Sequence, residues 1–457
     1  MQRARSRPPE RPCLRLCRRR SYAALCSRSR WSVGVPAVTV SAFIGGAGCG
    51  KTHMLMESLS AQLDVTPLHA GQRVLALTFM HGSRRRLEER LAMLQNLKGK
   101  TECTTIDSFA WRLVRRWRSL GAALGFVNIE PSEYERVCEA ASALAQVKEV
   151  HNWVAATFPI LVVDEAQDMT VNRLGMVAGL ANRLKVFVAA DEFQCLSEEL
   201  RPNPACSWLY QVCVPEELTQ PHRTNVNELL NAARAIRAGE APKSEKFFVV
   251  AQTSTPPLAG AWINSNLSWY GGGKSVAIIT PTYGTFARAA LAWAAANKTK
   301  RGAGPYDIAW EQSEAKAATE YLATIQLADQ ADGPSITAVL AAAGDARTTR
   351  DVTEWLEIQR RTRAKVEFAR NEVVKLVEQS FSQRRQSRRS EVHGWKGMTV
   401  HGAKNREFDN VIVLWPAAVG GSDEQRRRLL YNAVTRAKER CLVLVQAAAH
   451  MGRSPFT

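Results

Sequence analysis

The sequence predicts an α/β protein of two lobes, each built on a parallel sheet with helices on both faces. Short apolar runs typical of buried strands alternate with helix-like stretches, and this alternation occurs twice along the 457 residues. Strands that alternate with helices favour parallel pairing, because each crossover helix returns the chain to the same edge of the sheet. A chain of this length also exceeds what one hydrophobic core normally holds.

The first lobe is expected over residues 36–218. Its expected strands are the apolar runs 38–44, 74–79, 160–163 and 185–190. The first run leads into a glycine-rich turn, and a helix is expected to begin near Thr52. Residues 86–153 are poor in strand signals, so we expect a mainly helical insertion there.

The second lobe is expected over residues 219–450. Its expected strands are the runs 275–280, 410–414 and 441–445. Residues 290–394 are strand-poor and are expected to form a second helical insertion. Residues 252–274 contain Pro256-Pro257 and three consecutive glycines, a composition that predicts a loop.

Charge and composition narrow the class of protein. The net charge of +18 favours a polyanion as partner, with nucleic acid first. Residues 1–30 hold ten arginines and one glutamate, so 1–35 is expected to be a basic, disordered tail without the apolar region of a signal peptide. No run of apolar residues is long enough for a membrane helix, so no membrane partner is expected. The cysteines lack zinc-ligand spacing, and the absence of a secretory signal predicts a cytoplasmic location.

A phosphate-binding loop is the first motif with a clear chemistry. The octet is Gly45-Gly46-Ala47-Gly48-Cys49-Gly50-Lys51-Thr52, which matches G-x-x-x-x-G-K-[ST] between a strand and a helix. Its glycines let backbone amides surround phosphate oxygens. Lys51 is expected to reach the β- and γ-phosphates of ATP, and Thr52 to ligate Mg²⁺.

An acidic cluster, 164–168, follows directly on the apolar run 160–163. The end of a strand beside a phosphate loop is where a carboxylate holds Mg²⁺. We expect Asp164 to hold the ion through water and Glu165 to polarise the attacking water. Two adjacent carboxylates repel each other unless a cation offsets their charge, so the alternative without a nucleotide is a solvated acidic turn.

Six further segments, in order along the chain, resemble motifs of the UvrD/Rep family of superfamily 1 DNA helicases. They are 74–79 with the basic helix 84–91, 104–109 (T-x-H-S-F in the family), 190–194 (G-D-x-x-Q), 218–224 (L-x-Q-N-Y-R-S), 398–408 (T-x-H-x-A-K-G-x-E-F) and 431–437 (Y-V-A-x-T-R-A). The resemblance implies two RecA-like lobes with ATP in the cleft between them, and motion on single-stranded or partly duplex DNA, 3′ to 5′. A protein that loads it or a nuclease is a further expected partner.

The resemblance also implies roles for residues of the nucleotide site. Gln194 is expected to sense the γ-phosphate, and Glu407 to contact the ribose. Arg223 and Arg436 are expected to be arginine fingers, since guanidinium groups offer a fixed fork to phosphoryl oxygens. His222 stands where the family stacks a tyrosine on adenine.

The expected strand-contacting residues are Phe79, Ser108, Phe109, Thr399 and His401. For the two phenylalanines the alternative is a place in the hydrophobic core. The arginine clusters 360–363 and 384–389 either follow the phosphates of the strand or form solvated helix faces.

The chain departs from the family at two places that concern the nucleic acid. Asp107 stands where the family has the histidine of T-x-H-S-F, and 195–199 lacks the aromatic residues that stack on bases. These departures leave two alternatives open beside the DNA motor: an RNA-directed motor of the same superfamily with weak unwinding, and an ATP-gated switch that binds nucleic acid without stepping.

Overall fold

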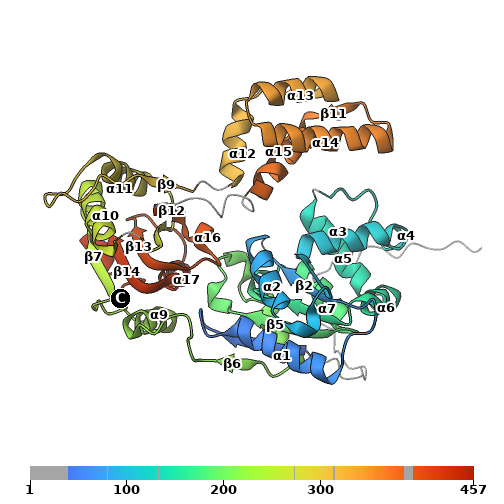
Figure 1. Cartoon of the computed structure of the whole chain (residues 1–457), viewed down its shortest axis with the longest axis horizontal. Helices are drawn as coiled ribbons and strands as arrows, with labels where there is room; N and C mark the ends of the chain where they lie inside the picture. Colours follow the sequence, from blue (N-terminus) through green and yellow to red (C-terminus); the bar gives the residue numbers. More distant parts are fainter. Residues whose placement is uncertain (1–39, 80, 132, 272, 312–313, 385–394) are drawn as a thin grey trace, which may run out of the picture. The chain divides into compact units, whose positions relative to one another are not determined.

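The computed structural model describes residues 40–457, apart from 80, 132, 272, 312–313 and 385–394. The expected basic tail, 1–35, and most of the arginine cluster 384–389 lie outside the described residues. The described residues form a pair of six-stranded parallel sheets covered by helices, which confirms the predicted α/β fold (Figure 1). Among these residues, none of the helices has the length and apolarity that crossing a bilayer would take.

The first sheet has the strand order β3-β2-β4-β5-β1-β6, and every neighbouring pair is parallel. Its strands are β1 (Val40–Gly45), β2 (Val74–Thr78), β3 (Thr101–Thr105), β4 (Ile160–Val163), β5 (Lys185–Ala190) and β6 (Glu216–Leu218). All residues of β2 and β4 are buried, as expected for strands covered on both faces. The carboxyl ends of all six strands therefore meet at one edge.

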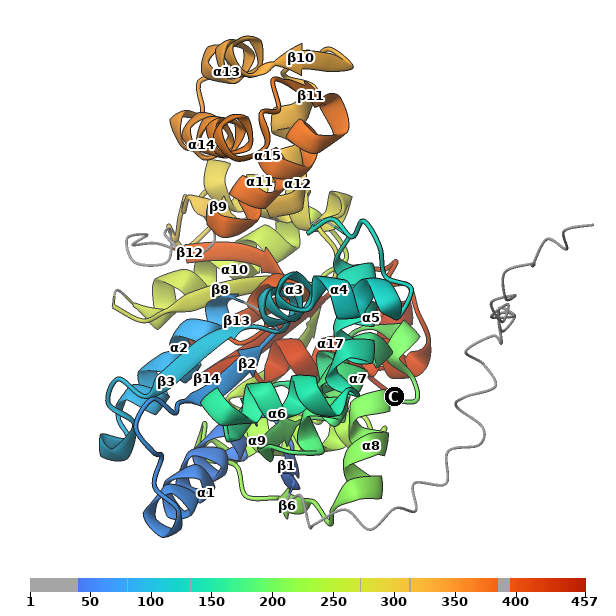
Figure 2. The same ribbon diagram turned by 90° about the vertical axis from the view of Figure 1, so that its right-hand side faces the viewer.

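Helices cover both faces of the first sheet. They are α1 (Lys51–Val65), α2 (His81–Ala92), α3 (Ile106–Arg116), α4 (Arg118–Ala123), α5 (Tyr134–Ala145), α6 (Lys148–Thr157), α7 (Val171–Ala181) and α8 (Pro204–Val212). Figure 2 shows α3, α5, α6 and α7 grouped together, and their apolar residues share one core cluster. The strand β3 lies inside the range 86–153 that we expected to be helical. Its sequence, TECTT, is polar and half-exposed, so it carries no apolar signal.

The second sheet has the strand order β7-β14-β13-β8-β12-β9, again with parallel pairs only. Its strands are β7 (Phe248–Gln252), β8 (Val276–Thr280), β9 (Ile308–Trp310), β12 (Trp395–Thr399), β13 (Phe408–Trp415) and β14 (Ala437–Val445). The helices α9 (Asn227–Ala238), α10 (Pro256–Tyr270), α11 (Thr285–Ala296), α16 (Val400–Ala403), α17 (Asp423–Val434) and α18 (Ala448–Met451) belong to the same lobe.

The expectation of a loop over 252–274 is wrong, because α10 occupies most of it. Pro256 and Pro257 stand in the first turn, where a helix has no backbone donor to lose. Thr255 caps this turn by accepting a hydrogen bond from the amide of Leu258. The two prolines thus begin a helix, and the glycine at 271 ends it.

The second helical insertion is shorter than the expected 290–394. The cluster consists of α12 (Glu314–Ala323), α13 (Gly333–Ala342), α14 (Ala346–Arg363) and α15 (Arg370–Arg384), with the antiparallel pair β10 (Gln330–Asp332) and β11 (Glu367–Ala369) (Figure 1). It has a hydrophobic core of its own. By contrast, α11 and β9 pack into the layer of the second sheet.

Candidate nucleotide site

The phosphate-binding loop connects the carboxyl end of β1 to the first turn of α1. Gly48 and Gly50 have φ angles of 78° and 77°, a left-handed conformation that side chains disfavour. At Gly48 a Cβ would also lie 2.7 Å from the Cβ of Arg223, so the loop needs glycine there for a second reason. The turn aims the amides at the N-terminus of α1 toward one point, which suits a phosphate.

Lys51 lies across the inside of this loop. Its Nζ donates hydrogen bonds to the carbonyl oxygens of Gly45 (3.0 Å) and Gly46 (2.8 Å), and it lies 3.8 Å from Oδ2 of Asp191. The side chain is 11% exposed, so its positive charge is held beside the loop and open to the cleft on one side only. This is the position from which an ammonium group reaches phosphate oxygens.

Asp191 is a fully buried carboxylate that connects both lobes to the loop. It follows β5, as Asp164 follows β4, so the two acids share one edge of the sheet. Its oxygens accept from Nε2 of Gln194 (2.9 Å) and from Nη1 of Arg237 (2.9 Å) on α9. Asp191 stands in the segment that resembles G-D-x-x-Q, but the sequence predicts no role for it, and it does not predict Arg237 at all. The position after β5 is a signal for the aspartate, whereas an arginine in α9 has no motif to mark it.

Asp164 and Thr52 form the pair expected to hold a metal ion. Oγ1 of Thr52 donates to Oδ2 of Asp164 over 3.3 Å. Burial, then the neighbouring Glu165 carboxylate, raise the pKa of Asp164 from 3.8 to about 6. A hydroxyl and a carboxylate that need a compensating cation fit Mg²⁺, which binds proteins through one or two such ligands and completes its shell with water and phosphate.

Glu165 has a different environment from its neighbour. Burial alone would raise its pKa, but the charges of Lys404 and Lys51 and the hydrogen bond from Gln167 outweigh burial, so the pKa lies below the ordinary value. Nε2 of Gln167 donates to Oε2 of Glu165 over 2.5 Å. The backbone of Glu165 is left-handed, with φ of 61°. This uncommon conformation, at the end of β4, directs an ionised carboxylate into the cleft.

The second lobe contributes two arginines and a glutamate. Arg223 donates from Nε to Oε1 of Glu407 (2.9 Å) and from Nη1 to the carbonyl oxygen of Thr435 (2.8 Å). These partners fix the guanidinium next to the phosphate-binding loop. The backbone amide of His222 donates to the carbonyl oxygen of Gly48 over 2.7 Å, so this segment closes directly on the loop.

Arg436 is the most informative cation of the site. It is 1% exposed, and its hydrogen bonds go to the carbonyl oxygens of Asn432 and Arg406 and to Oγ1 of Thr435. Within the described residues no carboxylate forms an ion pair with it. Burial, then the nearby Arg223, lower its pKa to about 10. A buried guanidinium without a carboxylate partner is costly unless an anion completes it.

These groups line one cavity of about 470 Å³. Among its lining residues are Gly48, Gly50, Lys51, Thr52, His53, Asp164, Glu165, Gln194, His222, Arg223, Glu407 and Arg436. The structure thus brings together the expected catalytic residues and most of the expected nucleotide-binding residues. A volume of several hundred cubic ångströms is typical of a small-molecule site.

The remaining loop residues, Gly45, Gly46, Ala47 and Cys49, line a second cavity of about 310 Å³ on the other side of the loop. There the hydroxyl of Tyr431 accepts a hydrogen bond from the amide of Ala47 over 2.8 Å. Burial raises the pKa of the Cys49 thiol, which disfavours the reactive thiolate.

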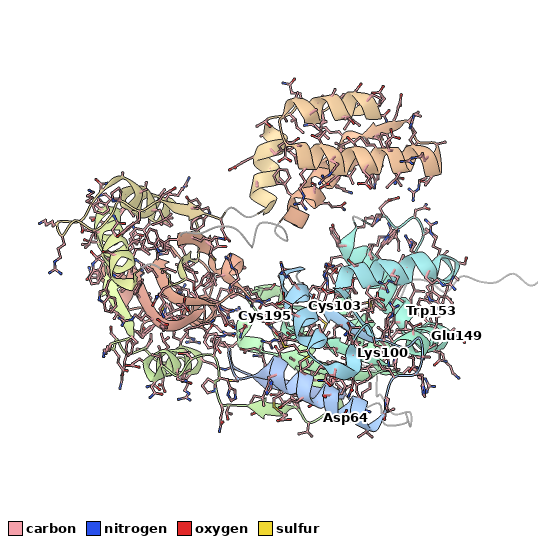
Figure 3. All side chains as sticks on the ribbon, viewed as in Figure 1. Asp64, Lys100, Cys103, Glu149, Trp153 and Cys195 are labelled. Carbon is pink, nitrogen blue, oxygen red and sulfur yellow. The ribbon has the colours of Figure 1, made fainter. Side chains whose placement is uncertain are left out.

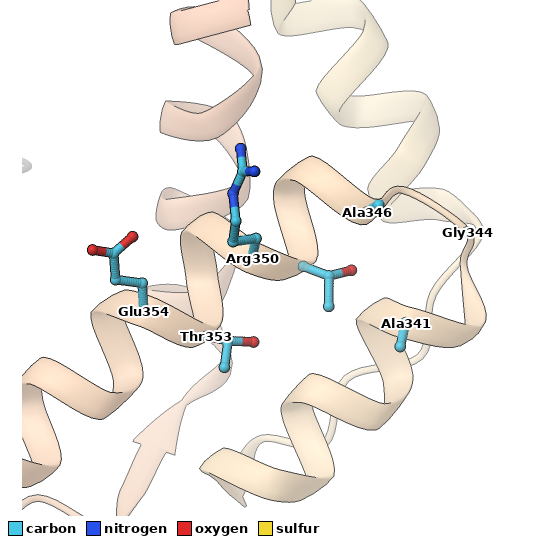
Figure 4. Close-up of a pocket in the computed structure, with 7 residues that line it drawn as sticks. Ala341, Gly344, Ala346, Arg350, Thr353 and Glu354 are labelled. Atoms are coloured by element: carbon cyan, nitrogen blue, oxygen red, sulfur yellow. The ribbon is translucent and has the colours of Figure 1, made fainter.

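A third cavity, of about 690 Å³, lies between α13 and α14 of the helical cluster (Figure 4). Figure 4 shows that its lining consists of small side chains together with Arg350 and Glu354. It shares no residue with the nucleotide cavity, and it holds none of the motifs.

The residues expected to contact a strand divide into two groups. Ser108 and His401 are exposed, and Thr399 caps α16 by accepting from the amide of Gly402 over 3.1 Å. Phe109 is 1% exposed and packs edge to face on Phe158, with ring centroids 6.4 Å apart. For Phe109 the core alternative therefore holds, because a ring enclosed in this way has no face open to a base.

Phe79 is half-buried against the same core, and the guanidinium of Arg173 lies 5.4 Å from its ring centroid. Arg173 also compensates Asp107, which stands where the family has the histidine of T-x-H-S-F. Nε of Arg173 donates to Oδ1 of Asp107 over 2.8 Å, and its Nη1 bonds Glu135 and Thr170. The charge of Asp107 is thus compensated within the protein.

An ion pair joins the short helix α16 to the acidic cluster of the first lobe. Nζ of Lys404, which follows α16, lies 2.6 and 2.5 Å from the two carboxylate oxygens of Asp168. Lys404 is 9% exposed, and its charge also acts on Glu165. The segment that carries Thr399 and His401 is therefore bonded to the acidic cluster 164–168, which contains the acid pair Asp164 and Glu165.

Comparisons with known proteins identify two domains in the chain. Residues 35–199 match the family described as an AAA domain, and residues 397–444 match the UvrD-like helicase C-terminal domain. No curated protein matches the chain.

Two solved structures, both of helicases from an arterivirus, are similar to this chain. The crystal structure of Arterivirus nonstructural protein 10 (helicase) is 11% identical, with a TM-score of 0.39 over 92% of this chain and 63% of that one. Its complex with DNA is also 11% identical, with a TM-score of 0.38 over 91% of this chain and 63% of that one. The chain thus spans about 63% of the length of these helicases.

The two family matches cover complementary regions of the nucleotide cavity. The AAA match contains Lys51, Asp164 and Gln194, and the UvrD-like match contains Glu407 and Arg436. Apart from 218–224, the motifs that resemble the UvrD/Rep family therefore lie within the matched domains. The chain thus combines a match to an AAA domain with a match to a UvrD-like helicase C-terminal domain, which are the two domains of a superfamily 1 helicase.

Proposed function

We propose that this protein hydrolyses ATP in the cavity between its two sheets and uses the hydrolysis to move along single-stranded DNA, in the 3′ to 5′ direction. The observation that carries the proposal is that three cations, Lys51, Arg223 and Arg436, line one cavity together with two carboxylates. A triphosphate with its metal ion has the charge distribution that complements this arrangement.

The residues divide the work as follows. The loop amides and Lys51 hold the β- and γ-phosphates. Thr52 and Asp164 hold Mg²⁺, which offsets negative charge on the phosphates when bound. Glu165, kept ionised by Lys404 and Lys51, accepts the proton of the attacking water.

Charge that develops on the γ-phosphoryl group is stabilised from the second lobe. Arg436 is buried and has no carboxylate partner among the residues that the structure describes, so an anionic ligand completes its environment. Arginine fingers typically contribute about 10³ to 10⁵ in rate. Gln194 and Arg237 of the second lobe both donate to the carboxylate of Asp191. A displacement of Gln194 when it contacts the γ-phosphate is therefore transmitted to the second lobe.

The strand lies along Ser108 in the first lobe and along Thr399 and His401 in the second. The net charge of +18 favours a polyanion over a neutral substrate. Because Lys404 links α16 to Asp168, contact of the strand with α16 has a direct path to the acid pair. Hydrolysis and strand binding are therefore coupled, which is what a translocating motor requires.

The test is the rate of ATP hydrolysis with and without single-stranded DNA, in the intact chain and in Lys51→Ala. We expect strong stimulation by the strand, and loss of hydrolysis in the variant because the phosphates lose their ammonium contact. Strand displacement on substrates with 3′ and 5′ overhangs then determines the direction.

Stimulation by single-stranded RNA in place of DNA would reassign the substrate to RNA. ATP binding with little hydrolysis and no response to either strand would contradict the motor and favour a nucleotide-gated switch.

A further inference from the structure

The segment after Gln194 offers no surface on which a base can stack. Cys195 and Leu196 are 1% and 7% exposed, so both face the interior (Figure 3 labels Cys195). The exposed residues that follow are Ser197 and two glutamates, which are neither aromatic nor attractive to a phosphate. A strand that crosses the first lobe at this point therefore gains no stacking from it.

The second lobe has a stacked pair of aromatic rings instead. The rings of Tyr283 and Trp310 are parallel within 9°, with centroids 3.7 Å apart. The indole of Trp310 packs directly on Gly397, where an added Cβ would lie only 2.6 Å from the ring. Any side chain at Gly397 would displace the indole. Tyr283 and Trp310 are both partly exposed residues.

The sheet register brings this pair to the edge that carries the expected strand contacts. Tyr283 follows the carboxyl end of β8, where Oγ1 of the buried Thr280 donates to the carbonyl oxygen of Thr282 over 2.9 Å. Thr280 is paired with Thr399 of the neighbouring strand, and Trp310 with Gly397. Tyr283 and Thr399 thus extend from adjacent, parallel strand ends.

The charges around the pair complement a nucleic-acid backbone. Arg288, an exposed residue in the first turn of α11, has its guanidinium carbon over the Tyr283 ring, 5.8 Å from the centroid. Glu311, next to Trp310, is neutralised by Lys396 (3.4 Å) and by both terminal nitrogens of Arg406. A phosphate near the rings therefore meets net positive charge.

We propose that Tyr283, backed by Trp310, is a stacking platform for an unpaired base of the single strand. Base-to-ring stacking is how proteins hold single strands without reading their sequence, and an arginine beside the ring is the usual companion. The platform takes over the stacking that the first lobe lacks. This inference rests on the proposed function, since it assumes that a strand binds at the carboxyl edge of the second sheet.

The platform is also joined to the nucleotide site within the same lobe. Arg406 contacts Glu311 beside the rings, and its carbonyl oxygen accepts from Nη1 of Arg436 at 3.5 Å. The residue after Arg406 is Glu407, which lines the nucleotide cavity. Occupation of the platform therefore has a short, rigid connection to the cavity.

The experiment measures strand affinity by fluorescence anisotropy with two probes of equal length, an oligo-dT and an oligonucleotide of abasic sites. Stacking needs the base, whereas phosphate contacts do not. We expect Tyr283→Leu to weaken oligo-dT binding about tenfold and to leave binding of the abasic probe unchanged. Tyr283→Phe keeps the ring and should bind like the unaltered chain.

Trp269→Leu is the matched control. Trp269 is an aromatic residue of the same lobe that is 63% exposed, and its ring centroid lies 3.8 Å from the guanidinium carbon of Arg440 on β14, away from Tyr283. Its loss should change neither affinity. Binding of a fluorescent ATP analogue by every variant verifies that the fold is intact.

Equal loss of affinity for both probes in Tyr283→Leu would overturn the platform, and so would unchanged oligo-dT binding. In either case, an unaltered chain that binds strands and is stimulated by them leaves the proposed function standing. Failure of the unaltered chain to bind either probe would overturn both proposals.

Discussion

At the scale of single residues, two neighbouring acids of the same cluster have opposite electrostatic settings. Asp164 is surrounded so that its ionised form is disfavoured, whereas Glu165 is surrounded by lysines that favour ionisation. The difference suits two roles. Asp164, as a metal ligand, would be stabilised in its ionised form only by a bound cation, whereas Glu165, as a general base, must be ionised without one.

Asp164→Asn should make the protein more heat-stable at pH 7 without metal, while it abolishes hydrolysis. The pKa of the folded carboxyl is about 6, above the ordinary 3.8, so its contribution to stability is full below about pH 4 and is lost as the pH rises through about 6. The amide has no charge to lose. We expect a melting temperature higher by on the order of 2–4 °C in EDTA at pH 7.

Asp409→Asn serves as a control of opposite sign. Ser275 donates two hydrogen bonds of 2.8 Å to that carboxylate, whose pKa lies below the ordinary value because these bonds and nearby lysines outweigh burial. Its replacement should lower the melting temperature at pH 7. An Asp164→Asn protein that melts at or below the unaltered chain would contradict the setting described for Asp164.

At the scale of elements, α16 is a four-residue helix that begins beside Thr399, a residue expected to contact the strand, and ends before a lysine. Thr399 caps it, His401 is exposed on it, and Lys404 follows it to reach Asp168. A helix of four residues moves as a rigid unit, so a displacement at one end also displaces the other end.

Lys404→Met should reduce stimulation of hydrolysis by a strand more than it reduces the rate without a strand. The ion pair with Asp168 is the direct link between α16 and the acid cluster, and a coupling of the usual size corresponds to about tenfold. The measurement is the ratio of the two rates. Lys274→Met, which removes a lysine paired with Glu439 on the surface, should keep the ratio. A normal ratio in Lys404→Met would assign the coupling to another contact.

The elements also show what the sequence is able to predict. Apolar strands such as β4 and β5 are evident because burial on both faces demands uninterrupted apolar side chains. Half-exposed strands such as β3 and three-residue strands such as β9 carry no such pattern. The prolines at the start of α10 led to the expectation of a loop. Proline disrupts the interior of a helix, but it is compatible with the first turn.

At the scale of the whole molecule, motifs located the nucleotide site but not the contacts between segments far apart in sequence. Lys51, Asp164 and Arg436 are predicted from their local patterns. The bond between Arg237 and Asp191 and the pairing of Tyr283 with Trp310 depend on which strands become neighbours. Those neighbours are set by the strand order, which no local pattern contains.

The helical cluster α12–α15 is expected to be dispensable for nucleotide binding. It has its own core and shares no residue with the nucleotide cavity. The strands that flank it, β9 and β12, are parallel neighbours, so a linker of about fifteen Gly and Ser residues, long enough to return from the carboxyl end of β9 to the amino end of β12, can join 311 to 395. We expect the shortened chain to fold and to bind a fluorescent ATP analogue with unchanged affinity. Loss of that binding would show that the cluster supports the cavity.

The length of β13 has a mechanical consequence. Glu407, at the nucleotide, precedes this strand of eight residues, which at about 3.3 Å per residue extends about 26 Å toward the opposite edge of the sheet. A sheet is stiff along its strands, so under the proposed function the second lobe would rotate as a rigid body about the nucleotide cavity. A rotation of about 10° at the pivot displaces the far edge by about 4–5 Å, slightly more than the rise of about 3.4 Å between successive bases of a strand. For the proposed motor, the length of this strand therefore predicts a displacement of about one nucleotide for each closure of the cavity on ATP.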